Sequence, residues 1–177
     1  AKRIKKNEPI PEGYIIKAVE DSTGNCIGFG SARVYSRSDR IENIDITNPS
    51  SIEYSDSDFP LLLLKHCYVH QEYQNKGIGT ETLYKLLNYG FKQYDLDECI
   101  VECWVKPHKI SSDELFEKFA YFTQRYHSTD YYTDIYNDDV YCNGCDRPEK
   151  DCICSGAIYS ADLSTVDHID RVEFGLE

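Results

Sequence analysis

The sequence has no methionine, a single tryptophan and no long apolar run. Its most apolar stretch is Leu61–Leu64, whereas a helix that crosses a bilayer needs roughly 20 apolar residues. The charged start, apolar middle and small-residue cleavage site of a secretory signal are also missing. We therefore expect no membrane segment and no secretion, and the missing initiator methionine agrees with a start that has been processed or trimmed.

Basic residues are few, because 19 lysines and arginines stand against 31 aspartates and glutamates, a net charge of −12. Proteins that bind nucleic acid through its phosphates need a basic surface, so the charge disfavours nucleic acid as a partner. It favours a cationic partner such as an amine, a polyamine or a basic peptide, although solubility alone explains the same charge. The clustered Lys2, Arg3, Lys5 and Lys6 predict a solvated N-terminal arm over residues 1–13.

The length and the 41% hydrophobic content predict one domain with its own core. Strand-forming runs at Tyr14–Glu20 and Cys26–Tyr35 flank a turn signal and predict a hairpin. Leu61–Val69 is apolar nearly throughout, as in a buried strand, and from Thr80 the apolar spacing becomes helical. Further strands are expected at Ile41–Ile46, Cys99–Lys106, Tyr131–Tyr136 and Gly156–Leu163, a helix at Ser111–Arg125 and a short element at Val172–Phe174.

The turn between the Leu61–Val69 strand and the following helix reads Gln74-Asn-Lys-Gly77-Ile-Gly79. Glycine lets the backbone approach a ligand closely. The first amides of a helix have no intrahelical acceptor and lie at its positive end, so the turn suits a pyrophosphate, with Thr80 adding a hydroxyl. A Walker motif and a complete dinucleotide fingerprint are both absent. The alternative interpretation is that these glycines only form a tight turn between the strand and the helix and bind no ligand.

Two segments together resemble one family. Tyr68–Gly90 resembles the acetyl-CoA-binding segment of the GCN5-related N-acetyltransferase (GNAT) superfamily, in which Gln/Arg-x-x-Gly-x-Gly/Ala lies between a central strand and a helix. Gln74, Gly77 and Gly79 match that pattern. Val105–Phe122 resembles the next segment of the family, and its end reads LFEKFAY where members carry a pattern like Leu-Tyr-Glu-Lys-x-Gly-Phe. With the hairpin, the resemblance covers roughly residues 14–122.

The resemblance implies a mixed α/β fold over residues 14–141, with a central mixed sheet, splayed parallel strands and flanking helices. It implies an N-acetyltransferase that uses acetyl-CoA as co-substrate, with the pantetheine arm paired to the strand ending at Val69. A primary amine would attack the thioester directly, helped by a backbone amide at the oxyanion, a base and an acid. The pyrophosphate would be held by Gln74, Asn75, Lys76, Gly77, Ile78, Gly79 and Thr80.

The sequence departs from the family where the general acid is expected. The usual tyrosine is Phe116 here, so Tyr121, Tyr126, another tyrosine or water would have to protonate the thiolate, or the domain binds CoA without transfer. Glu102 is the best candidate base, although an exposed strand glutamate is the simpler interpretation. His66 is interpreted as a structural histidine. The alternative function is therefore a non-catalytic binding or assembly module of the GNAT type.

The region before the hairpin is also short, because members usually have a strand and two helices where this sequence has 13 residues. Those helices help to wall the acceptor site. Here such a wall would have to be built from residues 36–60 and the C-terminal third, or it is absent. Several domains of the family dimerise, so a homodimer or another protein partner remains open.

The eight cysteines fall into two groups. Cys26, Cys67, Cys99 and Cys103 lie in strand-like runs, where a free cysteine behaves as a small hydrophobe. The other four form two close pairs that can converge tetrahedrally on zinc, and a four-cysteine site leaves no position for catalysis. They predict a zinc loop at 142–154, before a last strand and an acidic tail at 155–177, and a reduced, cytoplasmic setting. These four residues are Cys142, Cys145, Cys152 and Cys154. The alternatives to zinc are disulfides, free thiols or an iron–sulfur cluster.

Overall fold

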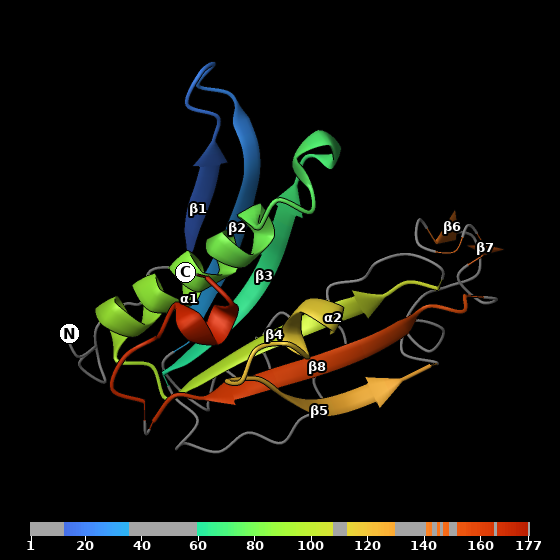
Figure 1. Cartoon of the computed structure of the whole chain (residues 1–177). Coiled ribbons are helices and arrows are strands. Elements are labelled where there is room, and N and C mark those ends of the chain that lie inside the picture. The colour runs from blue at the N-terminus through green and yellow to red at the C-terminus, as the bar shows by residue number, and fades with distance from the viewer. Residues whose placement is uncertain are drawn as a thin grey trace.

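The computed structural model describes residues 13–35, 60–107, 113–129, 141–142, 145, 147–148, 152–164 and 166–176. Within these ranges, six strands form one mixed sheet in the order β1-β2-β3-β4-β8-β5. They are β1 (Tyr14–Val19), β2 (Cys26–Tyr35), β3 (Leu61–Val69), β4 (Glu98–Val105), β5 (Thr123–Ser128) and β8 (Ser155–Asp162). The helices α1 (Ile78–Tyr94) and α2 (Asp113–Phe116) lie over the sheet in Figure 1. The mixed α/β fold class is confirmed.

The first three strands are antiparallel to one another. The expected hairpin is confirmed as β1 and β2, and β2 then pairs with β3. Ser31 pairs with His66 and Ala32 pairs with Leu64, so Lys65 is an extra residue that forms a bulge in β3. A bulge bends the strand and increases its twist, so the end of β3 is redirected from Lys65 onward.

The parallel neighbours β3 and β4 pair only at their beginnings. Leu61–Leu64 pairs with Glu98–Val101, yet β3 continues to Val69 and β4 to Val105. The burial of β3 changes at the same point, from buried residues to mostly exposed ones. Figure 1 shows the two strands diverging. The splayed strands implied by the resemblance are therefore present. We call the region between the diverging ends of β3 and β4 the V-shaped opening, and the two strands its walls.

The main core lies between the sheet, α1 and the C-terminal segment. Gly30 lets α1 approach β2, because a Cβ there would lie 2.5 Å from Leu86 Cδ1 and 2.8 Å from Thr82 Cγ2. Cys99 and Cys103 are buried, as the sequence predicts, but Cys26 and Cys67 are exposed. The interpretation of these last two as core residues is wrong, because both lie in the exposed end portions of their strands.

The expected helix over Ser111–Arg125 is wrong. In the described residues α2 covers only Asp113–Phe116, and β5 begins at Thr123. The pairing of β5 with β8 supplies backbone hydrogen bonds that a helix would otherwise have made. Phe116, Phe119 and Phe122 are nevertheless packed together, with ring centroids 4.9–6.4 Å apart.

The remaining expectations have mixed outcomes. The predicted strands at Cys99–Lys106 and Gly156–Leu163 are confirmed as β4 and β8, and the short element at the C-terminus is the 3-10 helix η6 (Val172–Phe174). The expected strands at 41–46 and 131–136, and the arm before Gly13, lie outside the described residues. Among the helices of the described ranges, none has the length and apolar character needed to span a membrane.

Candidate functional site

The turn between β3 and α1 leaves the start of the helix open. It contains the 3-10 helix η4 (Gln71–Tyr73), and then two residues with left-handed backbone, Asn75 at φ 59° and Gly77 at φ 77°. Gly77 is the N-cap, and its carbonyl accepts the first helical hydrogen bond, from the Glu81 N–H at 2.9 Å. The N–H groups of Ile78, Gly79 and Thr80 therefore have no acceptor within the helix. They lie at the positive end of the helix dipole, where such amides can bind an anion.

Glycine is favoured at position 77 by the backbone conformation there, and not because a side chain would lack space. A Cβ at this position would meet nothing within 4 Å, whereas its positive φ is one that side chains disfavour. Gly79 differs, because it lies in the helix and its Cβ would make an ordinary contact of 3.7 Å with Val69 Cγ2. The two glycines of the motif thus have separate roles.

Side chains of the turn hold its shape. Gln74 Nε2 donates to the Val69 carbonyl at 3.0 Å, which closes the turn onto the end of β3. The Tyr73 hydroxyl donates to Glu20 Oε1 at 2.8 Å, and Lys76 Nζ lies 5.1 Å from the Tyr73 ring centroid. Gln74 therefore braces the loop, a role that the sequence motif does not reveal, and Lys76 adds a positive charge to the turn that precedes the helix.

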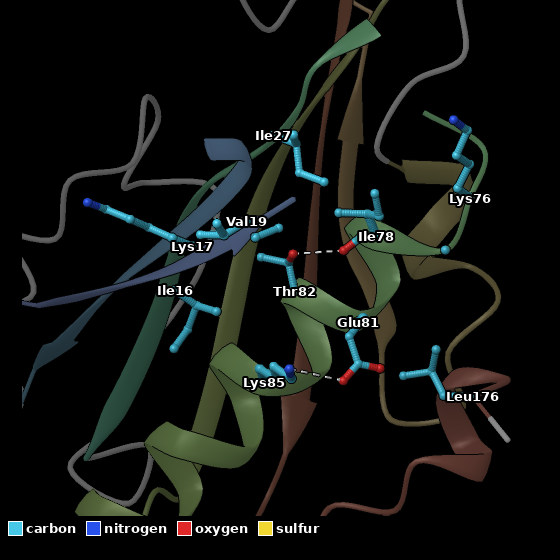
Figure 2. A pocket seen from close by; sticks show the side chains of 12 residues that line it. Ile16, Lys17, Val19, Ile27, Lys76, Ile78, Glu81, Thr82, Lys85 and Leu176 are labelled. Atoms are coloured by element: carbon cyan, nitrogen blue, oxygen red, sulfur yellow. Dashed lines mark hydrogen bonds and ion pairs between the residues drawn. The ribbon is translucent and has the colours of Figure 1, made fainter. Parts of the chain in front are cut away.

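A groove of about 450 Å³ adjoins this turn (Figure 2). It carries three lysines and one carboxylate, Glu81, which pairs with Lys85 at 3.5 Å and with Arg171 at 2.9 Å. The hydrogen bond from Arg171 holds the pKa of Glu81 below its ordinary value. Because Lys85 and Arg171 balance the negative charge of Glu81, the N-terminus of α1 keeps its positive electrostatic potential. The groove is lined by Ile16, Lys17, Ala18, Val19, Ile27, Lys76, Gly77, Ile78, Glu81, Thr82, Lys85 and Leu176.

The walls of the V-shaped opening carry two candidate bases. Val101 and Cys103 of β4 belong to the main core, so Glu102, which alternates with them, faces the opposite side of the sheet. Glu102 is partly exposed, and its Oε1 atom is buried. His66 Nδ1 lies 2.9 Å from Ser31 Oγ on β2. Ser31 alternates with Gly30, which faces α1, so the His66–Ser31 pair lies on the same face as Glu102.

The candidate acids lie on different elements. Phe116 is 2% exposed and stacks on Tyr159 with centroids 6.0 Å apart, so it is a core residue. The Tyr121 hydroxyl accepts a hydrogen bond from the Asp170 N–H at 2.9 Å, which ties it to the C-terminal segment. Tyr126 lies on β5, the edge strand beyond β8. Tyr126 and Glu102 both pair with Ile158 of β8, so Tyr126 lies on the same face as Glu102, with β8 between their strands, whereas Tyr121 packs against the main core.

The second cysteine group, Cys142, Cys145, Cys152 and Cys154, brings its four thiols close together. The Sγ atoms all lie within 4.8 Å of one another, with 3.6 Å between Cys142 and Cys154 and 3.7 Å between Cys145 and Cys152. Four thiolates about 2.3 Å from a tetrahedral zinc would stand about 3.8 Å apart, whereas a disulfide requires about 2.05 Å. The geometry therefore fits a metal site better than disulfides.

The cluster has its own small core and a short ladder. Cys142, Cys152 and Cys154 are buried, with Trp104 packed against them, and β6 (Tyr141–Cys142) pairs with β7 (Arg147–Pro148). Burial raises the pKa of the Cys145 thiol, but the Ile153 backbone and the neighbouring thiols outweigh it and lower the pKa to about 7. Burial raises the pKa of the Cys152 thiol to about 11 and also raises that of the Cys154 thiol, so a metal would have to displace the protons of these two.

Comparison with known proteins decides the family. The profile described as "Acetyltransferase (GNAT) family" matches residues 3–121, which is more than half of the chain. The chain belongs to the GNAT acetyltransferase family. No match is found among curated protein sequences.

Solved structures of acetyltransferases share this fold at low identity. The ribosomal-protein-S18-alanine N-acetyltransferase from Escherichia coli matches with a TM-score of 0.56 and 14% identity, over 88% of this chain and 72% of that one. A GNAT family acetyltransferase from Elizabethkingia anophelis with acetyl-CoA bound has a TM-score of 0.53 and 15% identity, over 86% and 77%. An acetyltransferase from Bacillus cereus ATCC 14579 has a TM-score of 0.54 and 10% identity, over 86% and 74%.

Proposed function

We propose that this GNAT protein transfers the acetyl group of acetyl-CoA to a primary amine. The observation that carries the proposal is the left-handed Gly77 turn, which opens the first amides of α1 beside the diverging ends of β3 and β4. The pyrophosphate of acetyl-CoA binds these amides next to Lys76, and the pantetheine arm follows the edge of β3 near Val69. A GNAT structure with this fold has acetyl-CoA bound.

The reaction is a direct transfer. The amine nitrogen attacks the thioester carbon, and a backbone amide of β3 stabilises the oxyanion of the tetrahedral intermediate. The intermediate collapses when its C–S bond breaks, and CoA leaves as a thiolate. Glu102 takes the proton that the amine loses, and water protonates the thiolate. His66 is the second candidate base because Ser31 holds it on the same face of the sheet.

We infer a cationic acceptor, because the chain carries a net charge of −12. A polyamine and the α-amine of a basic peptide both fit this description. The match to an enzyme named for the alanine of ribosomal protein S18 makes a peptide with an N-terminal alanine a reasonable third substrate to test.

We also propose that Cys142, Cys145, Cys152 and Cys154 bind one structural zinc ion. The support is the spacing of the sulfurs, which matches that of a four-thiolate zinc site. Zinc would tie the β6–β7 ladder to the residue that precedes β8. Four protein ligands leave no open coordination position, so the ion would supply stability and no chemistry.

The test is acetyl-CoA binding and turnover in a matched pair of glycine variants. Native mass spectrometry should show one acetyl-CoA per chain for the wild type and none for Gly77→Glu. Gly24→Glu is the control, because Gly24 also has a positive φ and open space but lies in the β1–β2 turn. Binding that survives in Gly77→Glu, or that is lost in both variants, would contradict the site.

Turnover is then measured with spermine, a lysine-rich peptide and a peptide with an N-terminal alanine, through release of free CoA thiol. Acetylation of any of them supports the enzyme. Binding without transfer to any amine would favour the second candidate, a non-catalytic acetyl-CoA-binding module. The specific observation in favour of that candidate is the buried Phe116, where family members present a tyrosine hydroxyl.

A further inference from the structure

We propose that the zinc-bound cysteine cluster holds the β4 wall of the V-shaped opening in place through Trp104, so that zinc occupancy governs acceptor use and leaves acetyl-CoA binding unchanged. The part that concerns the acceptor rests on the proposed function. Trp104 is thereby a positioning residue, which acts on the site through the strand that carries Glu102.

The first step is the contact between Trp104 and the cluster. The ring packs against the buried thiols of Cys142, Cys152 and Cys154. Its indole N–H is buried and lies beside the Cys154 thiol. A neutral thiol is a poor acceptor, whereas a metal-bound thiolate carries charge and accepts more strongly. Zinc therefore tightens this contact, as outer hydrogen bonds to metal ligands commonly do.

The second step is the backbone connection. Cys154 directly precedes β8, and the first pairs of that strand join Ser155 to Val105 and Gly156 to Trp104. The cluster therefore stands at the end of the β4–β8 ladder, on the portion of β4 that no longer pairs with β3. Glu102 lies two residues before Trp104, on the same face of the strand. An interaction that orders Trp104 and the start of β8 therefore also orders the part of β4 that carries Glu102.

The third step is the independence of the opposite wall. The turn after β3 is braced by the Gln74–Val69 and Tyr73–Glu20 hydrogen bonds, and β3 is held by its pairing with β2. Those contacts do not involve the cysteine cluster. Figure 1 shows β6 and β7 beyond the end of β4 and well separated from α1. The two walls of the opening thus have separate supports, so zinc removal should loosen one and spare the other.

The experiment compares the zinc-loaded chain with the chelated chain under reducing conditions by hydrogen–deuterium exchange. We expect faster exchange over residues 98–105 and 155–158 after zinc removal, and unchanged exchange over residues 66–80. Because Trp104 is the only tryptophan, its emission should shift to the red in the same titration. The acetyl-CoA dissociation constant should change by less than about twofold and the KM for spermine should rise about fivefold, the effect of losing one hydrogen bond.

Two variants separate coupling from loss of folding. Trp104→Phe keeps the ring but removes the N–H, so it should retain one zinc per chain and the acetyl-CoA affinity while raising the KM for spermine. Cys152→Ser should reproduce the chelated chain, and Cys26→Ser is its control because Cys26 is an exposed thiol outside the cluster.

The outcomes distinguish this inference from the proposed function. Equal exchange at 98–105 with and without zinc, an equal loss of acetyl-CoA affinity, or a chain that binds no zinc would overturn the coupling. If the exchange pattern responds to zinc but no amine is acetylated, the control of the β4 wall stands, and both the acceptor part and the proposed acetyltransferase activity fail.

Discussion

The N-cap position of α1 makes Gly77 the most sensitive single residue of the proposed site. We expect Gly77→Ala to lower the free energy of unfolding by about 1 kcal/mol, because alanine strains the left-handed backbone, and to weaken acetyl-CoA binding. Gly79→Ala is the matched control, because a methyl there fits and alanine has the higher helix propensity. Urea unfolding and calorimetric titration measure both effects. Equal losses in the two variants would contradict the assigned role of the left-handed turn.

Proton transfer supplies a second prediction for single residues. We expect Glu102→Gln to reduce kcat about 100-fold, the lower end of the range for a general base. His66→Asn is the comparison, since His66 lies on the same face and is bonded to Ser31. If His66→Asn causes that loss while Glu102→Gln does not, the histidine is the base. The measurement is the rate of CoA release at saturating acetyl-CoA.

Only some of these residues could be predicted from the sequence. The glycine turn and the cysteine cluster could be predicted, because each depends on residues that lie close together in the sequence. The His66–Ser31 pair could not, because it depends on the bulge at Lys65 and on the register between β2 and β3. The bracing role of Gln74 is hidden as well, since the motif does not show where its side chain points.

Among the elements, the C-terminal segment supports the helix that starts at the proposed site. Arg171 pairs with Glu81 of α1, and Phe174 of η6 packs on Phe119 with centroids 4.5 Å apart. We expect Arg171→Gln to lower the melting temperature slightly at pH 7, with Glu81→Gln adding little in the double variant. Because the folded-state pKa of Glu81 is depressed, the stabilisation is present above the ordinary carboxyl pKa and is lost as pH falls through the folded value.

Calorimetric melts of the four variants of this cycle at neutral and acid pH provide the check. The Lys85→Gln variant is the control for charge alone, since Lys85 also pairs with Glu81 but does not connect the C-terminal segment. A difference between wild type and Arg171→Gln that persists unchanged in acid would show that the pair contributes nothing.

The elements also show where sequence patterns mislead. Leu115, Phe116, Phe119 and Phe122 have helical spacing, but the chain turns at Phe119 and Phe122 and continues as β5. Phe116 and Phe119 are buried as predicted and Phe122 is partly buried against the same core, whereas the predicted helical backbone is wrong. The deciding interaction is the pairing of β5 with β8, a partner more than 25 residues away that local spacing does not reveal.

At the scale of the whole molecule, the net charge of −12 should act oppositely on the two substrates. The field of the chain attracts a polycation and repels the anionic acetyl-CoA, and salt screens both effects. Raising the salt from about 20 to about 200 mM should lower kcat/KM for spermine several-fold, while the association rate of acetyl-CoA stays level or rises. Glycinamide is the control acceptor, since it carries one positive charge and should respond far less. Equal salt dependence of spermine and glycinamide would remove the electrostatic argument for a cationic acceptor, and the acidity of the chain would then serve its solubility alone.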